Sequence, residues 1–279
     1  MTRRLERRPE GAAVRATPPG GKIMILGQDR VAYAGLLGEP TERGFGCLTV
    51  YSALGSPLRV CAQGEAFETE GMAVIPPYVP HRVSTPDRMI GVLMIEPESV
   101  DPSRLPRSLA AGRAREIHEP VASRVRESFL RLVRGDYGRD LTGVDVDLLF
   151  FGRLLERREL DPRIAAIVDR INRCPHGQLS AEESAQLAGL SFSRFLHLFR
   201  SEVGATFRGF RAWKRARSFL RYANGTPSLT DVALEIGYPD STHFSHSIRQ
   251  VYGLRPKDIF AGSRDLAIVR QDAERVAAR

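Results

Sequence analysis

Two stretches in the C-terminal half of the chain repeat one pattern: LSAEESAQLAGLSFSRFLHLFRSEVGATFRGF at residues 179–210 and SLTDVALEIGYPDSTHFSHSIRQVYGLRPKDI at residues 228–259. Small, apolar and glycine positions recur at matched spacing in both, except that the turn is one residue longer in the second. The recurring residues are Ala185, Gly189, Phe195, Phe199 and Gly204 in the first stretch and Ala233, Gly237, Phe244, Ile248 and Gly253 in the second. This repeat predicts two copies of one structural unit.

Each copy predicts a helix-turn-helix unit. The first helix must lie close against the second, which favours alanine at the contact, and the turn needs a backbone conformation that glycine adopts readily. Ser180 and Glu183 predict a capping box at the start of the first helix. We expect Ser191 to cap the second helix of this unit, and Thr230 to cap the first helix of the second unit.

The second helix of each unit is predicted to present a polar face to DNA, because the apolar residues at helical spacing point into the core. The residues expected to contact base edges or phosphates are Ser193, Arg194, Leu196, His197, Arg200, Lys214, Arg215, Ser241, Thr242, Ser245, His246 and Arg249. A helical bundle without DNA binding would also place alanine and apolar residues at helical spacing. Two matched copies with a basic segment between them favour the DNA-binding interpretation.

A basic helix is predicted between the units, from Phe207 to Tyr222. Eight basic residues and a single acid, Glu202, lie between Arg194 and Arg221. A helix of about 16 residues is about 24 Å long. With its flanking turns it could hold two recognition helices near the roughly 34 Å between successive major-groove faces. The net charge of +8 also favours a polyanionic partner.

The two stretches resemble the DNA-binding domain of AraC/XylS-type transcription regulators, over about residues 161–262. The run GYPDSTHFS and the Gly-Leu-Arg-Pro run at 253–256 are the more family-specific part. The resemblance implies an activator that binds double-stranded promoter DNA through two consecutive major grooves and contacts RNA polymerase. It assigns base reading to Ser193, Leu196 and His197 and to Ser241, Thr242 and His246.

Three of these residues depart from the family pattern. The positions of His197 and His246 often hold arginine, and Leu196 stands where a polar reader is common. A neutral imidazole offers one donor, and leucine offers only apolar contact, such as to a thymine methyl group. The preferred DNA sequence is therefore not carried over from the family.

Residues 22–115 predict an all-β domain. The apolar runs IMIL, LTVY, LRVC, MAVI and MIGVLMI alternate with clusters of Gly, Pro, Asp and Ser. GMAVIPPYVPHRV at 71–83 is similar to the strand-and-turn motif of the cupin fold. The family resemblance implies an α+β protein, with an N-terminal cupin-like β domain and accessory helices followed by an all-α DNA-binding domain.

An unknown small-molecule effector is expected to bind the β domain. The candidate effector-binding residues are Tyr51, Arg59, His81 and Arg82. The alternative, which the residue pattern favours, is that His81 is a histidine with satisfied hydrogen bonds at a Pro-rich strand end. The alternative function is a metal-dependent cupin enzyme with a helical appendage, which needs a His-x-His pair and an acid. The chain has no His-x-His, and we expect no metal, no cofactor and no enzymatic activity.

The remaining segments predict tails, accessory helices and location. Residues 1–21 are Arg-rich and then Pro/Gly-rich, which predicts a disordered basic tail. The linker at 116–160 contains amphipathic stretches at 121–133 and 141–155, which are first of all packing surfaces and can also form a homodimer. Asp161 followed by Pro162 predicts a helix start at the domain boundary, and 263–279 a C-terminal tail. No run is long enough to cross a membrane, so we expect a cytoplasmic protein.

Overall fold

The computed structural model describes residues 21–271 apart from 111, 119, 139, 178, 226 and 227. Within this part of the chain, no helix is long and apolar enough to cross a membrane. Residues 1–20 of the basic tail predicted at 1–21 lie outside the described residues, and so do residues 272–279.

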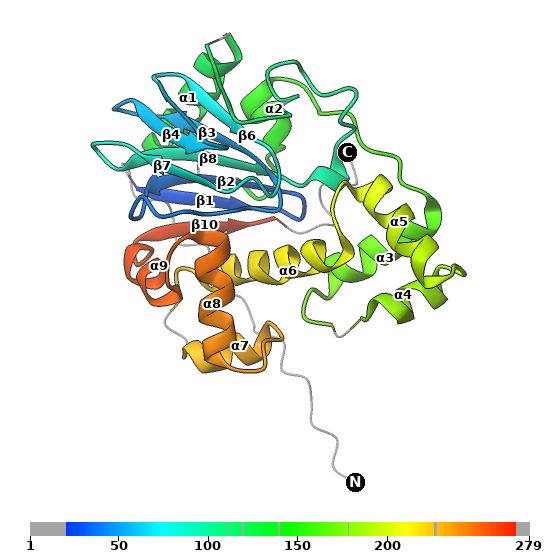
Figure 1. Ribbon diagram of the computed structural model, residues 1–279. Helices are drawn as coiled ribbons and strands as arrows, with labels where there is room; N and C mark the ends of the chain where they lie inside the picture. The colour runs from blue at the N-terminus through cyan, green and yellow to red at the C-terminus, as the bar shows by residue number, and fades with distance from the viewer. Residues whose placement is uncertain are drawn as a thin grey trace.

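An N-terminal domain of two sheets holds the first part of the chain (Figure 1). The larger sheet has the strand order β10-β1-β2-β8-β3-β6-β9, and the smaller has the order β5-β4-β7. The strands are β1 Lys22–Leu26, β2 Arg30–Leu36, β3 Leu48–Ala53, β4 Leu58–Ala62, β5 Glu65–Thr69, β6 Met72–Ile75, β7 His81–Ser84, β8 Met89–Ile95, β9 Arg115–Ile117 and β10 Leu266–Arg270, and a short 3₁₀ helix, η1 (Pro97–Ser99), follows β8. All five apolar runs that predicted strands form strands.

The larger sheet is buried on both faces, because successive side chains of a strand point to opposite sides. Tyr51 and Val92 lie in a core with residues of the smaller sheet. Val50 and Leu93 lie in a second core, which is covered by α1 (Pro120–Arg134) and α2 (Val146–Phe151). The accessory helices therefore pack on the sheet, as the apolar stripe predicted.

A helical region follows, and the α+β fold is confirmed. Its elements are α3 Pro162–Arg173, α4 Ala181–Leu187, α5 Phe192–Val203, α6 Phe207–Ser218, the 3₁₀ helix η2 Phe219–Tyr222, α7 Leu229–Glu235, α8 Ser241–Tyr252 and α9 Pro256–Gly262. Asp161 caps α3 by accepting a hydrogen bond from the Arg163 N–H, with Pro162 in the first turn. The basic helix predicted from Phe207 to Tyr222 is α6 continued by η2.

Two predicted segments differ from the structure. The tail predicted at 263–279 is wrong for Leu266–Arg270, which forms β10 and pairs in parallel with β1, from Lys22 beside Leu266 to Leu26 beside Arg270. The helix predicted at 141–155 is shorter, because only Val146–Phe151 is helical. Leu141 and Leu155 pack into the same core from the flanking loops.

The contact between the larger sheet and α1 depends on Gly91. A Cβ atom at this position would lie 2.4 Å from Cδ2 of the buried Phe129 ring. We expect Gly91→Ala to lower the free energy of unfolding by about 1–3 kcal/mol, because one ring or strand must shift. Denaturant unfolding measures this change. Gly44→Ala is the control, since no described atom lies within 4 Å of its Cβ, and an equal loss in both variants would contradict the packing argument.

Candidate nucleic-acid interface

The first helix-turn-helix unit consists of α4 and α5. The predicted capping box is present: the Glu183 N–H donates to Ser180 Oγ at 3.0 Å, and the Ser180 N–H donates to the Glu183 carboxylate at 2.7 Å. Gly189 in the turn has φ +64, a conformation that favours glycine. The next residue, Leu190, donates its N–H to the Ala185 carbonyl at 2.9 Å.

The second unit, α7 and α8, repeats this turn. Gly237 has φ +82, and the Tyr238 N–H donates to the Ala233 carbonyl at 2.8 Å. The prediction that Thr230 caps α7 is wrong, because the cap is Ser228, whose hydroxyl accepts from the Thr230 N–H. The sequence repeat therefore extends to the same backbone hydrogen bond in both turns.

The outer face of α5 is polar and basic. Phe195 and Phe199 are buried, as predicted, and Ser191 caps the helix. Ser193, Arg194, His197 and Arg200 are exposed, and Leu196 is half-buried against the core of its own unit. All five are residues that the sequence predicted to face DNA.

The outer face of α8 is also open. Phe244 and Ile248 are buried. The predicted contact residues Thr242, His246 and Arg249 are exposed, and Ser241 and Ser245 are half-buried. Asp240 caps the helix by accepting hydrogen bonds from the Thr242 and His243 N–H groups, each at 2.8 Å.

His243 is a residue of this face that the sequence analysis did not assign to DNA contact. Its Nδ1 lies 2.8 Å from Asp240 Oδ2, and its ring is exposed. Hydrogen bonds from the His243 N–H and ring lower the pKa of Asp240, so this side chain is a carboxylate at neutral pH. A carboxylate only accepts, and Nδ1 therefore donates, which leaves Nε2 available for a contact with DNA. The Asp-x-x-His spacing at a helix start is the signal that could have indicated this pair.

The basic character of α6 is only partly available to DNA. Lys214 is 4% exposed, and its Nζ lies 2.8 Å from Glu96 Oε2 and 2.5 Å from Glu98 Oε1. The predicted phosphate contact by Lys214 is therefore wrong for this structure, because its charge is taken up by two carboxylates of the N-terminal domain. Arg215 is half-buried, with its guanidinium 5.4 Å from the centre of the Tyr238 ring.

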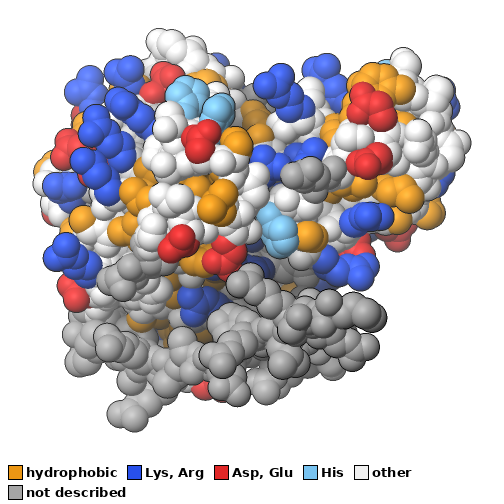
Figure 2. Space-filling view, turned by 90° about the horizontal axis from the view of Figure 1, so that it is seen from below, with side chains coloured by type: hydrophobic (Ala, Val, Ile, Leu, Met, Phe, Trp, Pro, Cys, Tyr) orange, Lys and Arg blue, Asp and Glu red, His pale blue; other side chains and the backbone are white. Residues whose placement is uncertain are grey.

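The two recognition helices lie near opposite ends of α6, α5 at one end and α8 at the other (Figure 1). Figure 2 views the molecule from below, the side on which α4 and α7 lie in Figure 1. Two lobes face the viewer, and Lys and Arg side chains gather along one edge of this surface. The arrangement separates two polar helix faces by the length of one basic helix.

The structure brings two of the four candidate effector residues together, Tyr51 and His81, and leaves the two arginines apart from them. Tyr51 and His81 lie inside the β domain, whereas Arg59 and Arg82 are exposed on the smaller sheet. His81 Nδ1 is 2.8 Å from the Val79 carbonyl, which can only accept, so Nε2 accepts from the Tyr51 hydroxyl at 2.7 Å. Both ring nitrogens are used, as in the alternative that the sequence left open.

Other side chains line the clefts of the surface. A cleft of about 690 Å³ is lined by Arg170, Ile171, Cys174, Pro175, Gly177, Leu179, Glu183, Gln186, Leu187 and Arg211. Another of about 400 Å³ is lined by Asp101, Pro102, Arg104, Glu156, Arg157, Arg158, Glu159 and Glu202. Among the described residues, no group of three or more His, Cys, Asp or Glu side chains could hold a metal ion.

Comparison with known proteins finds similarity in the helical region. Residues 184–262 match a family model described as a helix-turn-helix domain. The chain is 29% identical over 72 residues to Invasion protein InvF of Salmonella typhi and of Salmonella typhimurium. This similarity covers 25% of the chain and 33% of each relative, so it spans about a third of their length.

Solved structures match most of the chain at low identity. ToxT from Vibrio cholerae O395 has a TM-score of 0.56 and 10% identity, covering 85% of this chain and 99% of ToxT. An apo variant of ToxT from Vibrio cholerae strain SCE256 has a TM-score of 0.54 and 12% identity, covering 84% and 97%. ToxT bound to (E)-4-(8-methylnaphthalen-1-yl)but-3-enoic acid has a TM-score of 0.51 and 8% identity, covering 84% and 98%. These matches show a shared fold with both regions.

His81 predicts a pH dependence of stability. Burial lowers its pKa to about 4, and the charge of Arg43 acts in the same direction. The unfolded chain takes up this proton near its ordinary pKa of about 6.5. The contribution to stability is therefore complete above about pH 6.5 and lost as the pH falls towards 4, by up to roughly 3 kcal/mol. Denaturant unfolding across this range measures it.

His81→Gln is the test variant, because it removes the titrating group and keeps a polar side chain. We expect its stability to fall less steeply than that of the unaltered protein between pH 6.5 and 4. His118→Gln is the control, since His118 is exposed beside Glu116. Equal slopes in the unaltered protein and His81→Gln would contradict the assignment.

Proposed function

We propose that the chain is a sequence-specific DNA-binding transcription regulator of the AraC/XylS type, which acts as an activator at promoters; the match of residues 184–262 to a helix-turn-helix domain supports the proposal. The observation that carries the proposal is the repeated unit, whose two exposed polar helix faces lie near opposite ends of α6. In the proposal, α5 and α8 enter consecutive major-groove segments of one duplex.

Different side chains serve position and sequence in this proposal. Arg194 and Arg200 contact phosphates, which supplies affinity for any duplex. His197 and His246 reach base edges, where each imidazole offers a donor or an acceptor. The other proposed contact residues are Ser193, Ser241, Thr242, Ser245 and Arg249. Lys214 is no longer proposed to contact DNA, and Arg215 lies at the edge of the proposed DNA-binding surface.

A small-molecule effector of the N-terminal domain belongs to the same proposal. Support comes from the shared fold with ToxT, one structure of which holds a small organic acid. The dispersed positions of Tyr51, Arg59, His81 and Arg82 do not support these four as one binding site. Contact with RNA polymerase and homodimer formation are further parts of the proposal, taken from the family.

DNA binding is tested by selecting duplexes from fragments of the source genome and titrating the best of them. We expect affinity to fall steeply with salt, as several phosphate contacts require. Arg200→Ala should weaken binding to all duplexes and reduce the slope of log K against log salt by about 0.9. His246→Gln should instead change which base pair is preferred at one position. The free-energy difference between the preferred base pair and the others at that position should change by about 1–3 kcal/mol.

Arg82→Ala is the matched control for Arg200→Ala, because both arginines are exposed and Arg82 lies on the smaller sheet. Its binding should equal that of the unaltered protein. Absence of salt-dependent duplex binding would favour a helical adaptor that binds no DNA. An unchanged base preference in His246→Gln would place the reading face of α8 elsewhere.

Leu196 predicts a contact with a thymine methyl group. Once a preferred duplex is known, each thymine under the first unit can be replaced by deoxyuridine, which removes only that methyl group. We expect one replacement to weaken binding by roughly fourfold, the effect of about 0.8 kcal/mol for one buried carbon. Leu196→Ala should bind both duplexes equally. A fourfold difference that persists in Leu196→Ala would assign the contact to another residue.

A further inference from the structure

The two helix-turn-helix units differ in how their cores are completed. The first unit has a hydrophobic core of its own. This core contains Ile167 of α3, Ala185 of α4, Phe199 of α5 and Phe210 of α6. Around Phe199 the rings of Phe195, Phe207 and Phe210 lie with centroids 5.2 to 5.7 Å away. All described buried members of this cluster lie between Ile164 and Phe210, so the core of the first unit is built from its own segment of chain.

The second unit shares one core with the N-terminal domain. Phe244 and Ile248 of α8 belong to the same buried cluster as Tyr51 and Val60 of the sheets. Phe45, which precedes β3, joins the two, with its ring centroid 6.0 Å from that of Trp213 and 5.6 Å from that of Tyr252. The apolar side chains of the second unit and of the sheets therefore form one continuous core.

A glycine shows how close this approach is. A Cβ atom on Gly46 would lie 2.4 Å from Cγ of Trp213. The backbone of the N-terminal domain therefore touches the indole directly, at a distance that excludes any larger residue. The second half of α6 is therefore part of the core that the sheets and the second unit share.

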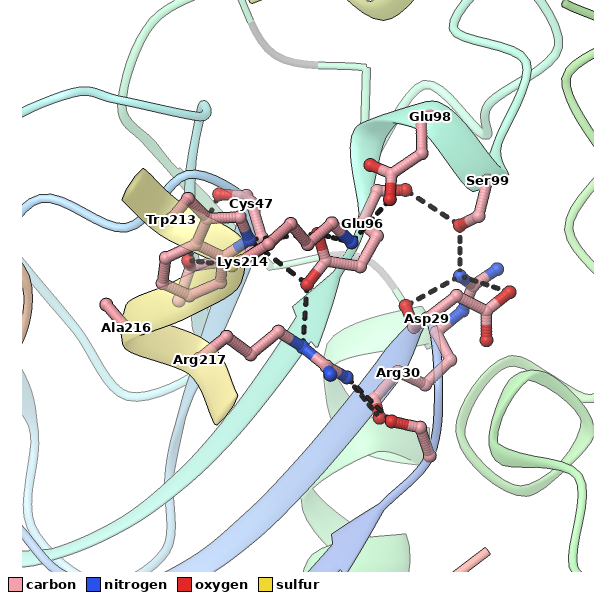
Figure 3. Close-up of polar contacts among 12 residues, drawn as sticks. Asp29, Arg30, Cys47, Glu96, Glu98, Ser99, Trp213, Lys214, Ala216 and Arg217 are labelled. Atoms are coloured by element: carbon pink, nitrogen blue, oxygen red, sulfur yellow. Dashed lines mark hydrogen bonds and ion pairs between the residues drawn. The ribbon is translucent and has the colours of Figure 1, made fainter. Parts of the chain in front are cut away.

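Buried charges hold the same half of α6. Glu96, 1% exposed, accepts a hydrogen bond from Trp213 Nε1 at 2.9 Å and pairs with Lys214 at 2.8 Å and with Arg217 at 2.7 Å (Figure 3). Arg217 also donates to the Gly27 carbonyl at 2.7 Å. Buried charges that lose their partners are costly, so this cluster resists separation of α6 from the sheet.

The strand β10 fixes the far side of the second unit. It follows α9 directly and pairs with β1 along its whole length. Asn224, which follows η2, donates to the Leu266 carbonyl at 3.2 Å, and Lys22 donates to the Gly262 carbonyl at 3.1 Å. The second unit is thus bound to the N-terminal domain through α6 before it and through β10 after it.

The first unit meets the preceding part of the chain through a border that is mainly polar, with Tyr78 as an aromatic contact: a Cβ atom on Gly209 of α6 would lie 3.6 Å from its ring. The cleft of about 400 Å³ lies here, lined by Asp101, Arg104, Glu156, Arg158 and Glu202. Arg158, in the segment before α3, donates to the Ser201 carbonyl of α5 at 3.2 Å. Polar, solvent-accessible contacts of this kind contribute little to stability.

We propose that the second helix-turn-helix unit belongs to the folding unit of the N-terminal domain, whereas the first unit is autonomous. A change in the stability or shape of the N-terminal domain then acts on α8 and spares α5. This inference concerns the chain itself. Its consequence for DNA rests on the proposed function: the regulatory domain controls the half-site read by α8, while α5 holds its half-site in every state.

Hydrogen exchange of the full chain, measured by mass spectrometry without DNA, tests the proposal. Val50→Ala weakens the core between the larger sheet and α1, whose described members include no residue of α8. We expect the slowest amides of α8 to exchange roughly tenfold faster, by the same factor as those of β3 and β8. The amides of α5 should keep their rates. Ile95→Val is a milder variant in the same core, for use where Val50→Ala does not fold.

Phe199→Leu is the reciprocal control, placed in the core of the first unit. It should accelerate exchange in α3, α4 and α5 and leave α8 and the sheets unchanged. The proposal is overturned if α8 keeps its rates in the sheet variants, or if α5 and α8 change together in them.

A footprint on the selected duplex adds the DNA consequence. The sheet variants should lose protection over the half-site of α8 and keep it over the half-site of α5. Equal loss over both half-sites would refute unequal control. If the unaltered protein binds no duplex, the proposed function fails, while hydrogen exchange still decides whether α8 and the sheets unfold together.

Discussion

The carboxylate of Glu96 organises the structure, because an ionised group buried to this degree must be paired. Its partners are the indole N–H of Trp213 and the cations of Lys214 and Arg217, all on one face of α6. Satisfying one acid at the end of β8 therefore fixes the position of the helix that joins the two units. The polar faces of α5 and α8 then lie near the two ends of this helix.

The sequence repeat was informative because a helix-turn-helix is a local structure. Alanine at the helix contact, glycine in the turn and Ser191 at the cap act within a few residues of one another, so spacing alone identified them. The pairing of Lys214 with Glu96 joins positions 118 residues apart, and no local pattern announces it. Basic residues on a helix can pair with DNA phosphates or with carboxylates of the same chain. The sequence pattern is the same in both cases, so it does not distinguish them.

The effector candidates show a different limit. Arg59 and Arg82 were grouped with His81 by residue type, but alternation along β4 and β7 sends these arginines to the outer face of the smaller sheet. Pleat parity in the short HRVS run could have separated Arg82 from His81, since neighbours in a strand point apart. The hydrogen bond from Tyr51 in β3 to His81 in β7 joins the two sheets, so it depends on how the sheets pack, which the sequence does not display.

The parallel pairing of β10 with β1 has a consequence for synthesis of the chain. β1 is among the first described residues to leave the ribosome and β10 among the last, so one edge of the larger sheet stays open throughout translation. An open edge offers unpaired N–H and C=O groups to other strands, and closing a contact over most of the chain length is slow. The outer edge of β1 therefore lacks its partner strand until β10 has been synthesised.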